Sequence, residues 1–422
     1  MRSKVFRFFC LAAVIIAALL VTGAAAAEKT VLLTFAGDVT LGGLDKERNN
    51  ADSFDGVAKQ QGYDYFFANF REMFEKDDLT FVNLEQALTD KENNRSGKKQ
   101  PLRGKTDFAK ILSQSSIEMV SLANNHTGDY GKQGETSTQQ ALEDNGIRWA
   151  KYPKYEIYEK DGIRIAFFAL RTIGVFNDPK DRAKLSKAIS QARETDGANA
   201  VIVYWHEGTE YKTYHEAEEE SRAKNLIELD GVDLVVMSHP HVAQGMSIFN
   251  NRCVFYSLGN FVFGGSRYIR SGPAPKDPYA ISLYAMVVQA KLTFANDGKY
   301  LGQQLTVYPI FTSSTKPDYQ LGDYFPPSDR IMFPNNYQPM RLTVKQAEAV
   351  YECIRRDSTV EIPQMTEKDG LAEIVFPYLP AFDGVMIPED SDADGGAIGS
   401  PEAASPRVTR ESKDTDTDDE GR

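Results

Sequence analysis

Two of the chain's five histidines lie two residues apart, directly after a predicted strand. Residues 232–237 form a short apolar run rich in β-branched side chains, which predicts a buried strand. The run is followed by Ser-His-Pro-His, in which Pro240 stiffens the turn between His239 and His241. This spacing would hold two imidazoles on one cation or on two adjacent cations. The alternative interpretation is a turn that carries two partly exposed histidines.

Other predicted strands also end in residues that can bind a metal. Asp38 follows the run 31–36, Glu85 follows 79–82, Asn125 and His126 follow 119–123, and His206 follows 201–205. Each residue alone has an ordinary explanation, such as a turn former for Asp38 or a helix cap for Asn125. Their joint position at strand ends instead indicates a clustered metal site.

The order of predicted elements indicates an α/β fold. Stretches at helical spacing separate the strands, over residues 106–116, 134–145, 181–193 and 216–229, and a further strand over 164–170 ends at Arg171. Strands that alternate with helices predict a layered domain with a largely parallel or mixed sheet. In such a domain the ligand crevice lies beyond the carboxyl ends of the strands, so we expect the candidate residues to gather there. His215 and the acidic run 216–220 are interpreted as a solvated helix face.

The two ends of the chain differ from its body. Basic residues within positions 2–7 precede the apolar run 8–21 and a small-residue stretch that ends at Ala27, which predicts a signal peptide or signal anchor over residues 1–27. We therefore expect an extracytoplasmic protein, secreted or anchored to the cell membrane by an uncleaved signal. From Pro388 on, 11 Asp or Glu stand against 4 Lys or Arg, which predicts a disordered acidic tail over residues 385–422.

The composition is that of an ordinary globular protein, with 41% apolar residues and a net charge of −12. No basic stripe is present, which excludes nucleic acid as a partner. The sequence leaves the pairing of Cys253 and Cys353 open. Residues 280–294 and 300–311 predict a hairpin, and a helix is expected near residues 343–356.

Five ordered blocks resemble the bacterial capsule synthesis protein CapA family, the group associated with poly-γ-glutamate synthesis. They are TFAGDVTLGG, FVNLEQALTD, VSLANNHTGDYG, VIVYWHEGTEY, and DLVVMSHPHVAQG with FYSLGNFVF, within about residues 31–265. That family is similar to calcineurin-like metallophosphoesterases, whose fold is a four-layer α-β-β-α sandwich with two metals at strand ends. The resemblance implies this fold over residues 28–315, with residues 316–384 as a C-terminal extension.

The resemblance also implies roles for the candidate residues. The metal ligands would be Asp38, Glu85, Asn125, His206, His239 and His241, with His126 as the catalytic residue and with Asn124 and Glu207 supporting the ligands. One metal would take Glu85, Asn125, His206 and His239, and the other Asp38, Glu85 and His241.

Two threonines depart from the phosphoesterase pattern. Thr40 stands where a further histidine is usual, so the metal beside Asp38 should be the weaker one. Thr127 stands where an acidic residue often follows the Asn-His pair, which leaves the orientation of His126 open.

The expected chemistry is metal-assisted hydrolysis. Mixed carboxylate, amide and imidazole ligands suit two divalent ions, Mn, Fe or Zn, which can activate water for an in-line displacement. The resemblance implies a role in the synthesis, export or attachment of an anionic capsule polymer such as poly-γ-glutamate, in a membrane-bound capsule synthesis complex. The enzyme would cleave a phosphoester or an amide of polyglutamate. The alternative is a non-catalytic component that binds the polymer, because a fold does not determine a function.

Overall fold

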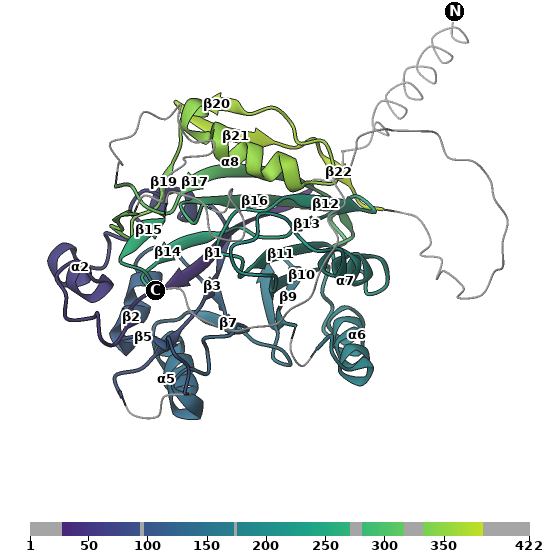
Figure 1. Ribbon diagram of the computed structural model, residues 1–422. Helices are drawn as coiled ribbons and strands as arrows, with labels where there is room; N and C mark the ends of the chain where they lie inside the picture. The colour runs from purple at the N-terminus through teal and green to yellow at the C-terminus, as the bar shows by residue number, and fades with distance from the viewer. Residues whose placement is uncertain (1–27, 93–96, 173–174, 271–280, 316–331, 383–422) are drawn as a thin grey trace, which may run out of the picture. The chain divides into compact units, whose positions relative to one another are not determined.

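The computed structural model describes residues 28–92, 97–172, 175–270, 281–315 and 332–382. These residues belong to one compact unit of mixed α/β structure (Figure 1). The predicted signal, residues 316–331 of the C-terminal segment and the acidic tail lie outside the described residues. None of the helices within the described ranges has the length and apolar character needed to cross a bilayer.

Two large sheets carry most of the strands. The larger sheet has the order β20 (Thr366–Lys368), β21 (Leu371–Val375), β17 (Tyr300–Phe311), β16 (Tyr284–Phe294), β1 (Lys29–Thr40), β3 (Leu79–Leu84), β6 (Met119–Ser121) and β7 (Arg148–Ala150), with β14 (Asn260–Phe263) on β1, and β19 (Met340–Arg341) and β22 (Leu379–Pro380) on β17. The second sheet has the order β12 (Met246–Phe249), β13 (Arg252–Phe255), β11 (Leu234–Ser238), β10 (Ala200–His206), β9 (Ile163–Arg171) and β8 (Glu156–Lys160).

Smaller sheets and the helices complete the unit. The small sheets are β2 (Gly43–Leu44), β5 (Leu102–Gly104) and β4 (Ala87–Leu88), and β15 (Tyr268–Arg270) with β18 (Met332–Pro334). The helices are α2 (Phe54–Gln61), α3 (Arg71–Phe74), the 3-10 turn η1 (Thr106–Phe108), α4 (Ala109–Ser113), α5 (Gly131–Asp144), α6 (Pro179–Glu194), α7 (Ala217–Glu228) and α8 (Val344–Asp357).

Parallel pairing aligns the strand ends that matter for the site. Strands β1, β3 and β6 of the larger sheet run parallel, as do β9, β10 and β11 of the second sheet. The carboxyl ends of each set therefore lie at one edge of their sheet. The predicted strands, helices and hairpin of this body are confirmed.

Two predicted strand ends lie further along the chain. Asp38 was expected just after a strand, but β1 continues to Thr40 because its end pairs with β14, where Asp38 lies beside Asn260. The register shifts between Asp38 and Thr40. His206 is the last residue of β10 rather than the first residue after it.

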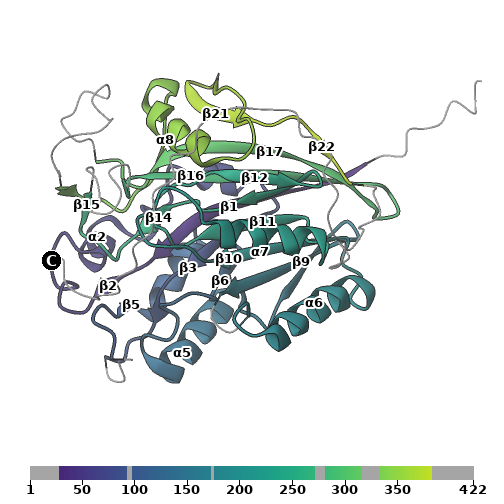
Figure 2. The ribbon, with the colours of Figure 1, turned by 45° about the vertical axis from the view of Figure 1, so that its right-hand side comes forward.

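The main hydrophobic core lies between the two large sheets. Alternate residues of β1 (Val31, Leu33 and Phe35) share one buried cluster with alternate residues of β9 and β10. This alternation follows the two-residue period of a strand. The second face of the larger sheet packs against α2, α4 and α5, and the second face of β9–β11 packs against α6 and α7 (Figure 2).

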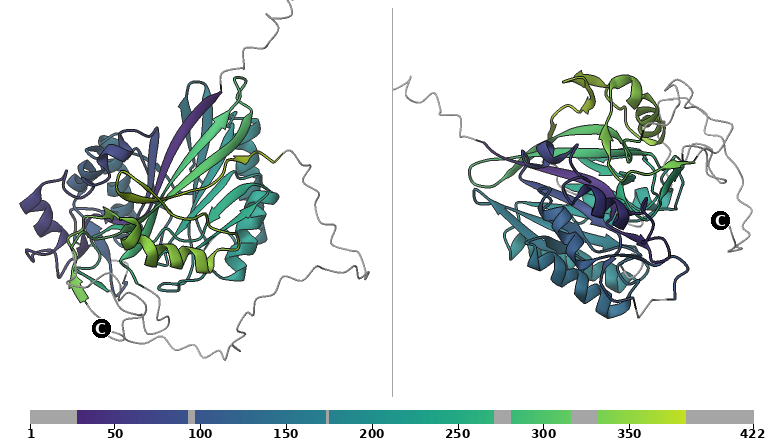
Figure 3. Two further views of the ribbon diagram at one scale, coloured as in Figure 1. Left: turned by 90° about the horizontal axis from the view of Figure 1, so that it is seen from above. Right: turned by 90° about the vertical axis from the view of Figure 1, so that its left-hand side faces the viewer.

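Helix α8 packs against the main body and does not form a separate core. Its buried residues Val350 and Ile354 belong to the same cluster as β17 and β21, over which it lies when seen from above (Figure 3). A capping box starts the helix, because the Thr343 hydroxyl accepts from Gln346 N while the Gln346 side chain accepts from Thr343 N. Cys353 on α8 and Cys253 on β13 are both buried and are not paired with each other.

His215 does not lie on a solvated face as expected. Its ring stacks on Tyr256, with the two centroids 3.7 Å apart, and 9% of its side chain is exposed. Its Nδ1 lies 3.0 Å from Oδ1 of Asp357, at the end of α8. The residue therefore links the segment before α7 to α8.

Candidate metal centre

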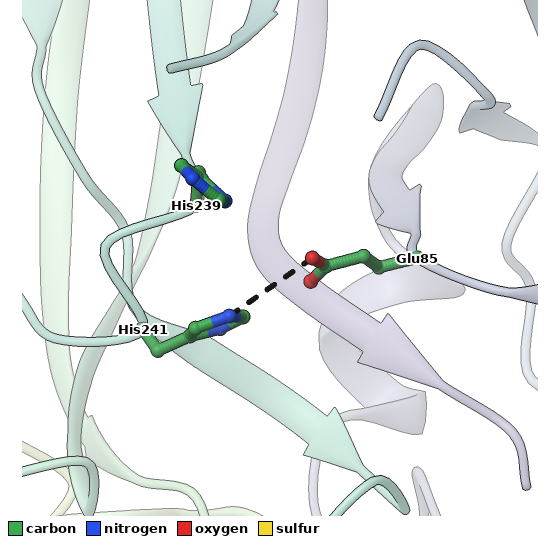
Figure 4. Close-up of side chains that lie close together, drawn as sticks. All are labelled: Glu85, His239 and His241. Carbon is green, nitrogen blue, oxygen red and sulfur yellow. Dashed lines mark ion pairs between the residues drawn. The ribbon is translucent and has the colours of Figure 1, made fainter. Parts of the chain in front are cut away.

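The structure brings carboxylates from the larger sheet and imidazoles from the second sheet together. Asp38 lies on β1 and Glu85 directly after β3, whereas His206 ends β10 and the His239–His241 turn follows β11. Two groups of three have ligand atoms within 4.8 Å of one another: Glu85, His239 and His241, and Asp38, Glu85 and His206. Figure 4 shows the first group, with His241 turned toward the Glu85 carboxylate.

The grouping differs in part from the expected one. Glu85 belongs to both groups, as a bridging ligand would. The two groups place His239 with His241 and His206 with Asp38, whereas His239 was expected with His206 and His241 with Asp38. His241 also lies beside Asp38, however, because its Nδ1 is 3.4 Å from Asp38 Oδ2. Asn125 joins His206, because its Oδ1 lies 2.9 Å from His206 Nε2.

Glu85 has the surroundings of a metal-binding carboxylate. Both of its oxygens are fully buried and lack a hydrogen-bond partner among the described residues. Oε1 lies 3.4 Å from His206 Nε2 and 3.9 Å from His241 Nε2. A buried carboxylate without a partner is costly, and a cation between these atoms would remove that cost. His239 Nδ1 is also buried without a partner, so this donor set fits a divalent metal.

The pKa values of the site follow from burial and from the proximity of the charged groups. Burial, and then the charge of Asp38, raises the pKa of Glu85 to about 8. Burial lowers the pKa of His206 and of His239 to about 3, so both imidazoles are neutral and able to bind a metal.

In the pair Asp38 and His241, by contrast, the charged form of each residue is favoured. Burial opposes the charged form of each residue, but the hydrogen bond and the attraction between opposite charges outweigh the effect of burial. The pKa of Asp38 is held well below its usual value, and the pKa of His241, which also feels the charge of Glu85, is raised. This pair is the ionic part of the metal-free site.

The turn that carries the two histidines is strained. His239 has φ of 114° and His241 has φ of 58°, in the region that favours glycine. Such a residue costs about 1–3 kcal/mol and is concentrated at functional sites. The Asp38 carboxylate helps to hold this turn by accepting a hydrogen bond from the backbone N–H of His239, at 3.1 Å.

A close approach of two chain segments positions Asp38. A Cβ atom added to Gly37 would lie 1.8 Å from the carbonyl oxygen of Gly259, and the N–H of Asp38 donates to that same oxygen at 3.0 Å. Only glycine fits at position 37 in this backbone arrangement.

Asparagines that the sequence left without a role hold the ligands. The side-chain amide of Asn83 donates to Asp38 Oδ1 at 2.8 Å and lies 3.1 Å from His206 Nδ1. Asn124, which was expected to support the ligands, donates to Asn83 Oδ1 at 3.0 Å. Asn260 Oδ1 lies 2.9 Å from His241 Nδ1, which leaves Nε2 of that ring facing Glu85. In the sequence, the only indication that these asparagines belong to the site is their position inside the five blocks quoted above.

His126 receives its acidic partner from position 129. Its Nδ1 lies 2.6 Å from Oδ2 of Asp129, a fully buried carboxylate that also accepts from the N–H of Leu102. Lys98 lies 3.0 Å from the other oxygen of Asp129. Asp129 therefore supplies the acidic partner of His126 that Thr127 cannot provide.

Glu207 has a different contact from the one expected. Its carboxylate lies 3.7 Å from Arg222 of α7, and no contact with a candidate ligand is found for it among the described residues. Burial, and then the charge of Glu219, raises the pKa of Glu207 to about 7.

Comparisons with known proteins were made with this geometry in hand. Residues 32–265 match the family model described as bacterial capsule synthesis protein PGA_cap. The capsule biosynthesis protein CapA of Bacillus anthracis is 29% identical over 258 residues, which cover 56% of this chain and 60% of that protein. The PGA biosynthesis protein CapA of Bacillus subtilis (strain 168) is 30% identical over 251 residues, which cover 54% and 62%.

The matched part of the chain thus spans about three fifths of these relatives, 60% of one and 62% of the other. Among solved structures, "GAP50 the anchor in the inner membrane complex of Plasmodium" aligns with 79% of this chain and 98% of its own, at a TM-score of 0.33 and 11% identity. That similarity is too low to support an inference about fold or function.

Proposed function

Because the chain belongs to the family of bacterial capsule synthesis proteins, we propose that it is a metal-dependent hydrolase of capsule biosynthesis. The observation that carries this proposal is the buried carboxylate of Glu85, which lacks a hydrogen-bond partner among the described residues and lies beside three imidazoles. We take the two facing sheets with outer helices as a metallophosphoesterase-type α-β-β-α sandwich with a C-terminal extension. The three hydrophobic clusters support this interpretation.

The site would hold two divalent ions, Mn, Fe or Zn, bridged by Glu85. The ions would supply Lewis-acid chemistry at the reacting bond. The protein's own part is to fix the ligands through Asn83 and Asn260 and to hold His126 on Asp129. With Nδ1 of His126 occupied by Asp129, its Nε2 is the nitrogen that would pass a proton to the leaving atom.

The proposed substrate is an anionic capsule polymer such as poly-γ-glutamate. Support comes from the relative in Bacillus subtilis, whose name assigns it to PGA biosynthesis. The bond cleaved is an amide of that polymer or a phosphoester. The signal-like N-terminus supports a place outside the cytoplasm, secreted or anchored, within a membrane-bound capsule synthesis complex that exports or attaches the polymer.

One observation favours a second candidate, a non-catalytic component that binds the polymer. Thr40 replaces an expected histidine, and it is fully buried with its hydroxyl accepting from the N–H of Gly265 at 2.8 Å. The side chain at this position is therefore occupied in packing and does not replace the missing ligand.

Two variants separate these candidates. His239→Ala should lose bound metal, whereas His126→Asn should keep the metal and lose turnover. Metal content is measured by elemental analysis, and chelator-sensitive hydrolysis is followed on a phosphodiester and on a γ-linked glutamate oligomer. Full metal loading without hydrolysis of either substrate would favour the binding component. A wild type with less than about 0.2 metal per chain after loading would contradict the metal centre itself.

A further inference from the structure

A cavity of about 440 Å³ lies next to the candidate metal centre. Asn124 and Asn125 form part of its wall, and Asn125 Oδ1 is the atom that lies 2.9 Å from His206 Nε2. Arg171 forms another part, at the end of β9, directly beside His206 in the parallel register of β9 and β10. The cavity and the metal centre therefore share a wall.

The charges that line this cavity are mostly positive. Among the described residues, its lining cations are Lys98, Lys151 and Arg171, and Asp129 is the only acidic residue in the lining. The Asp129 carboxylate is fully buried and already contacts His126 and Lys98. The positive wall is a local feature, because the whole chain carries a net charge of −12.

Arg171 is the cation in this wall for which the described residues provide no partner. Lys151 lies 2.6 Å from a carboxylate oxygen of Glu135, and Lys98 contacts Asp129. Within the described ranges no hydrogen bond or ion pair is found for the Arg171 guanidinium. A planar guanidinium binds a carboxylate or a phosphate through two parallel hydrogen bonds, so it is suited to an anionic ligand.

In the larger cavity beside α2, about 910 Å³, most of the lining cations already have acidic partners. Three of its four lining cations pair with acids in the same wall: Arg48 lies 2.7 Å from Asp55, Lys105 lies 3.7 Å from Asp55, and Arg103 pairs with both Asp45 and Glu92. Cations that are already paired offer little to a further anion.

We infer that the cavity beside Asn125 is a subsite for an oxyanion of the substrate, and that Arg171 recognises this group. The inference rests on the proposed function, because it assumes that the reacting bond lies at the metal centre. Each residue of a γ-linked glutamate chain carries a free α-carboxylate next to its amide bond. Such a polymer would place one carboxylate against Arg171 whenever an amide reaches the metal ligands. A substrate phosphate has the same chemistry and is the second source of the oxyanion.

The test measures binding and requires no turnover. A fluorescently labelled γ-linked penta-glutamate is titrated with the manganese-loaded full chain and followed by anisotropy. The uncharged probe is γ-linked penta-isoglutamine, in which each α-carboxylate is replaced by a carboxamide. Arg171→Gln should weaken penta-glutamate binding about 10- to 100-fold, the usual effect of losing a charged hydrogen bond. The affinity of Arg171→Lys for penta-glutamate should lie between those of the wild type and of Arg171→Gln, because lysine keeps the charge and loses the paired hydrogen bonds.

Arg164→Gln is the matched control. Arg164 lies on the same strand, β9, near its other end, and its ion pair with Glu159 is exposed. This variant should bind penta-glutamate as the wild type does, because exposed pairs contribute little. Melting curves of all variants confirm that each is folded.

The two sources of the oxyanion are separated by a competition with inorganic phosphate. Arg171-dependent binding of penta-glutamate supports the carboxylate, and Arg171-dependent binding of phosphate alone supports the subsite with a phosphate ligand. Equal binding of penta-glutamate and penta-isoglutamine overturns the inference, as does an Arg171→Gln variant that binds as the wild type does, or a wild type that binds neither anion. Arg171-dependent binding in a protein without hydrolysis would refute the hydrolase and keep the subsite.

Discussion

The carboxylate of Glu85 combines complete burial with the lack of a hydrogen-bond donor among the described residues. In the metal-free protein this arrangement opposes folding, because burial and then the charge of Asp38 raise the pKa of Glu85 to about 8, so the carboxyl group must take up a proton when the chain folds at neutral pH. The same arrangement favours a cation that can contact Glu85 together with His206 and His241. The stability of the metal-free protein should therefore fall as the pH rises from 4.5 to about 8.

Glu85→Gln tests this account with nearly unchanged side-chain volume. We expect the metal-free variant to melt no lower than the metal-free wild type at neutral pH, because the raised pKa of Glu85 lowers the stability of the wild type between pH 4.5 and about 8, whereas an amide does not titrate. Manganese should raise the melting temperature of the wild type and leave that of the variant unchanged. Calorimetry with and without manganese measures both effects. A variant that still binds two ions would show that Glu85 is not the bridging ligand.

A second prediction concerns the proton donor assigned above. Asp129 holds Nδ1 of His126 at 2.6 Å, so Asp129→Asn should leave the ring with a weaker partner and a less defined tautomer. If the protein is a hydrolase, kcat should fall about 10- to 100-fold with little change in KM or in metal content. Steady-state kinetics and elemental analysis check this. A loss of metal in parallel with kcat would instead assign Asp129 a role in holding the metal site.

At the scale of elements, the crossing of β1 with the segment before β14 decides where Asp38 lies. Gly37→Ala would force a Cβ to within 1.8 Å of Gly259 O, so β1 or its neighbour must move. We expect a loss of stability of about 1–3 kcal/mol or more, as for other overpacked sites, together with weaker metal binding.

Gly128→Ala is the control for that substitution. Gly128 lies in the loop after His126, and no atom lies within 4 Å of an added Cβ. This variant should stay within about 0.5 kcal/mol of the wild type in chemical denaturation. Equal effects of the two substitutions would mean that the close contact at Gly37 does not control the site.

The contact of His215 with the end of α8 should make stability depend on pH. Burial alone would lower the pKa of His215, but the hydrogen bond to Asp357 and the charges of Asp357, Glu220 and Glu219 raise it above 6.5. A raised histidine pKa stabilises the folded state fully below the unfolded value of 6.5, and this contribution is lost as the pH rises through the folded value.

His215→Gln should therefore destabilise the protein by about 1 kcal/mol near pH 6, with a smaller difference from the wild type at higher pH. Urea denaturation at several pH values gives the two curves. A difference that is constant with pH would assign the effect to packing on Tyr256 and not to the charge of the imidazole.

The strand and helix pattern could be read from the sequence because it depends on local periodicity. Apolar runs such as 31–36 and 232–237 carry that signal within a few residues. The position of Asp38 inside β1 could not be read, because it depends on pairing with β14 more than 200 residues away. The same holds for the contact of His215 with Asp357, which are 142 residues apart.

Among the site residues, those at strand ends could be predicted, because parallel strands place their carboxyl ends together. The supporting residues were harder to predict. Asn83 is a strand residue with no periodic signal of its own, and Asp129 lies three residues after His126, where a turn former explains it equally well. Arg171 was visible as a strand end, but its lack of a partner among the described residues depends on the fold.

At the scale of the whole unit, the candidate ligands come from two sheets that share one core. Asp38 lies near the end of β1, Glu85 and Asn125 follow strands of the larger sheet, and the three histidines follow or end strands of the second sheet. A bound ion would therefore connect the sheets at one edge of the core, in addition to the apolar contacts between them. Metal binding and docking of the two sheets should be coupled, because only the docked arrangement brings the ligands together.

This coupling predicts a simultaneous response of both sheets to metal. At manganese 100-fold above its Kd, binding to the folded state alone adds about 2.7 kcal/mol of stability. Hydrogen exchange should then slow together in the peptides around Glu85 and around His206, and also in strands such as β16 that do not contact the site, because these exchange through global unfolding. His239→Ala should abolish all of these changes. Protection confined to the His239–His241 turn would show that the ion orders a loop and does not connect the sheets.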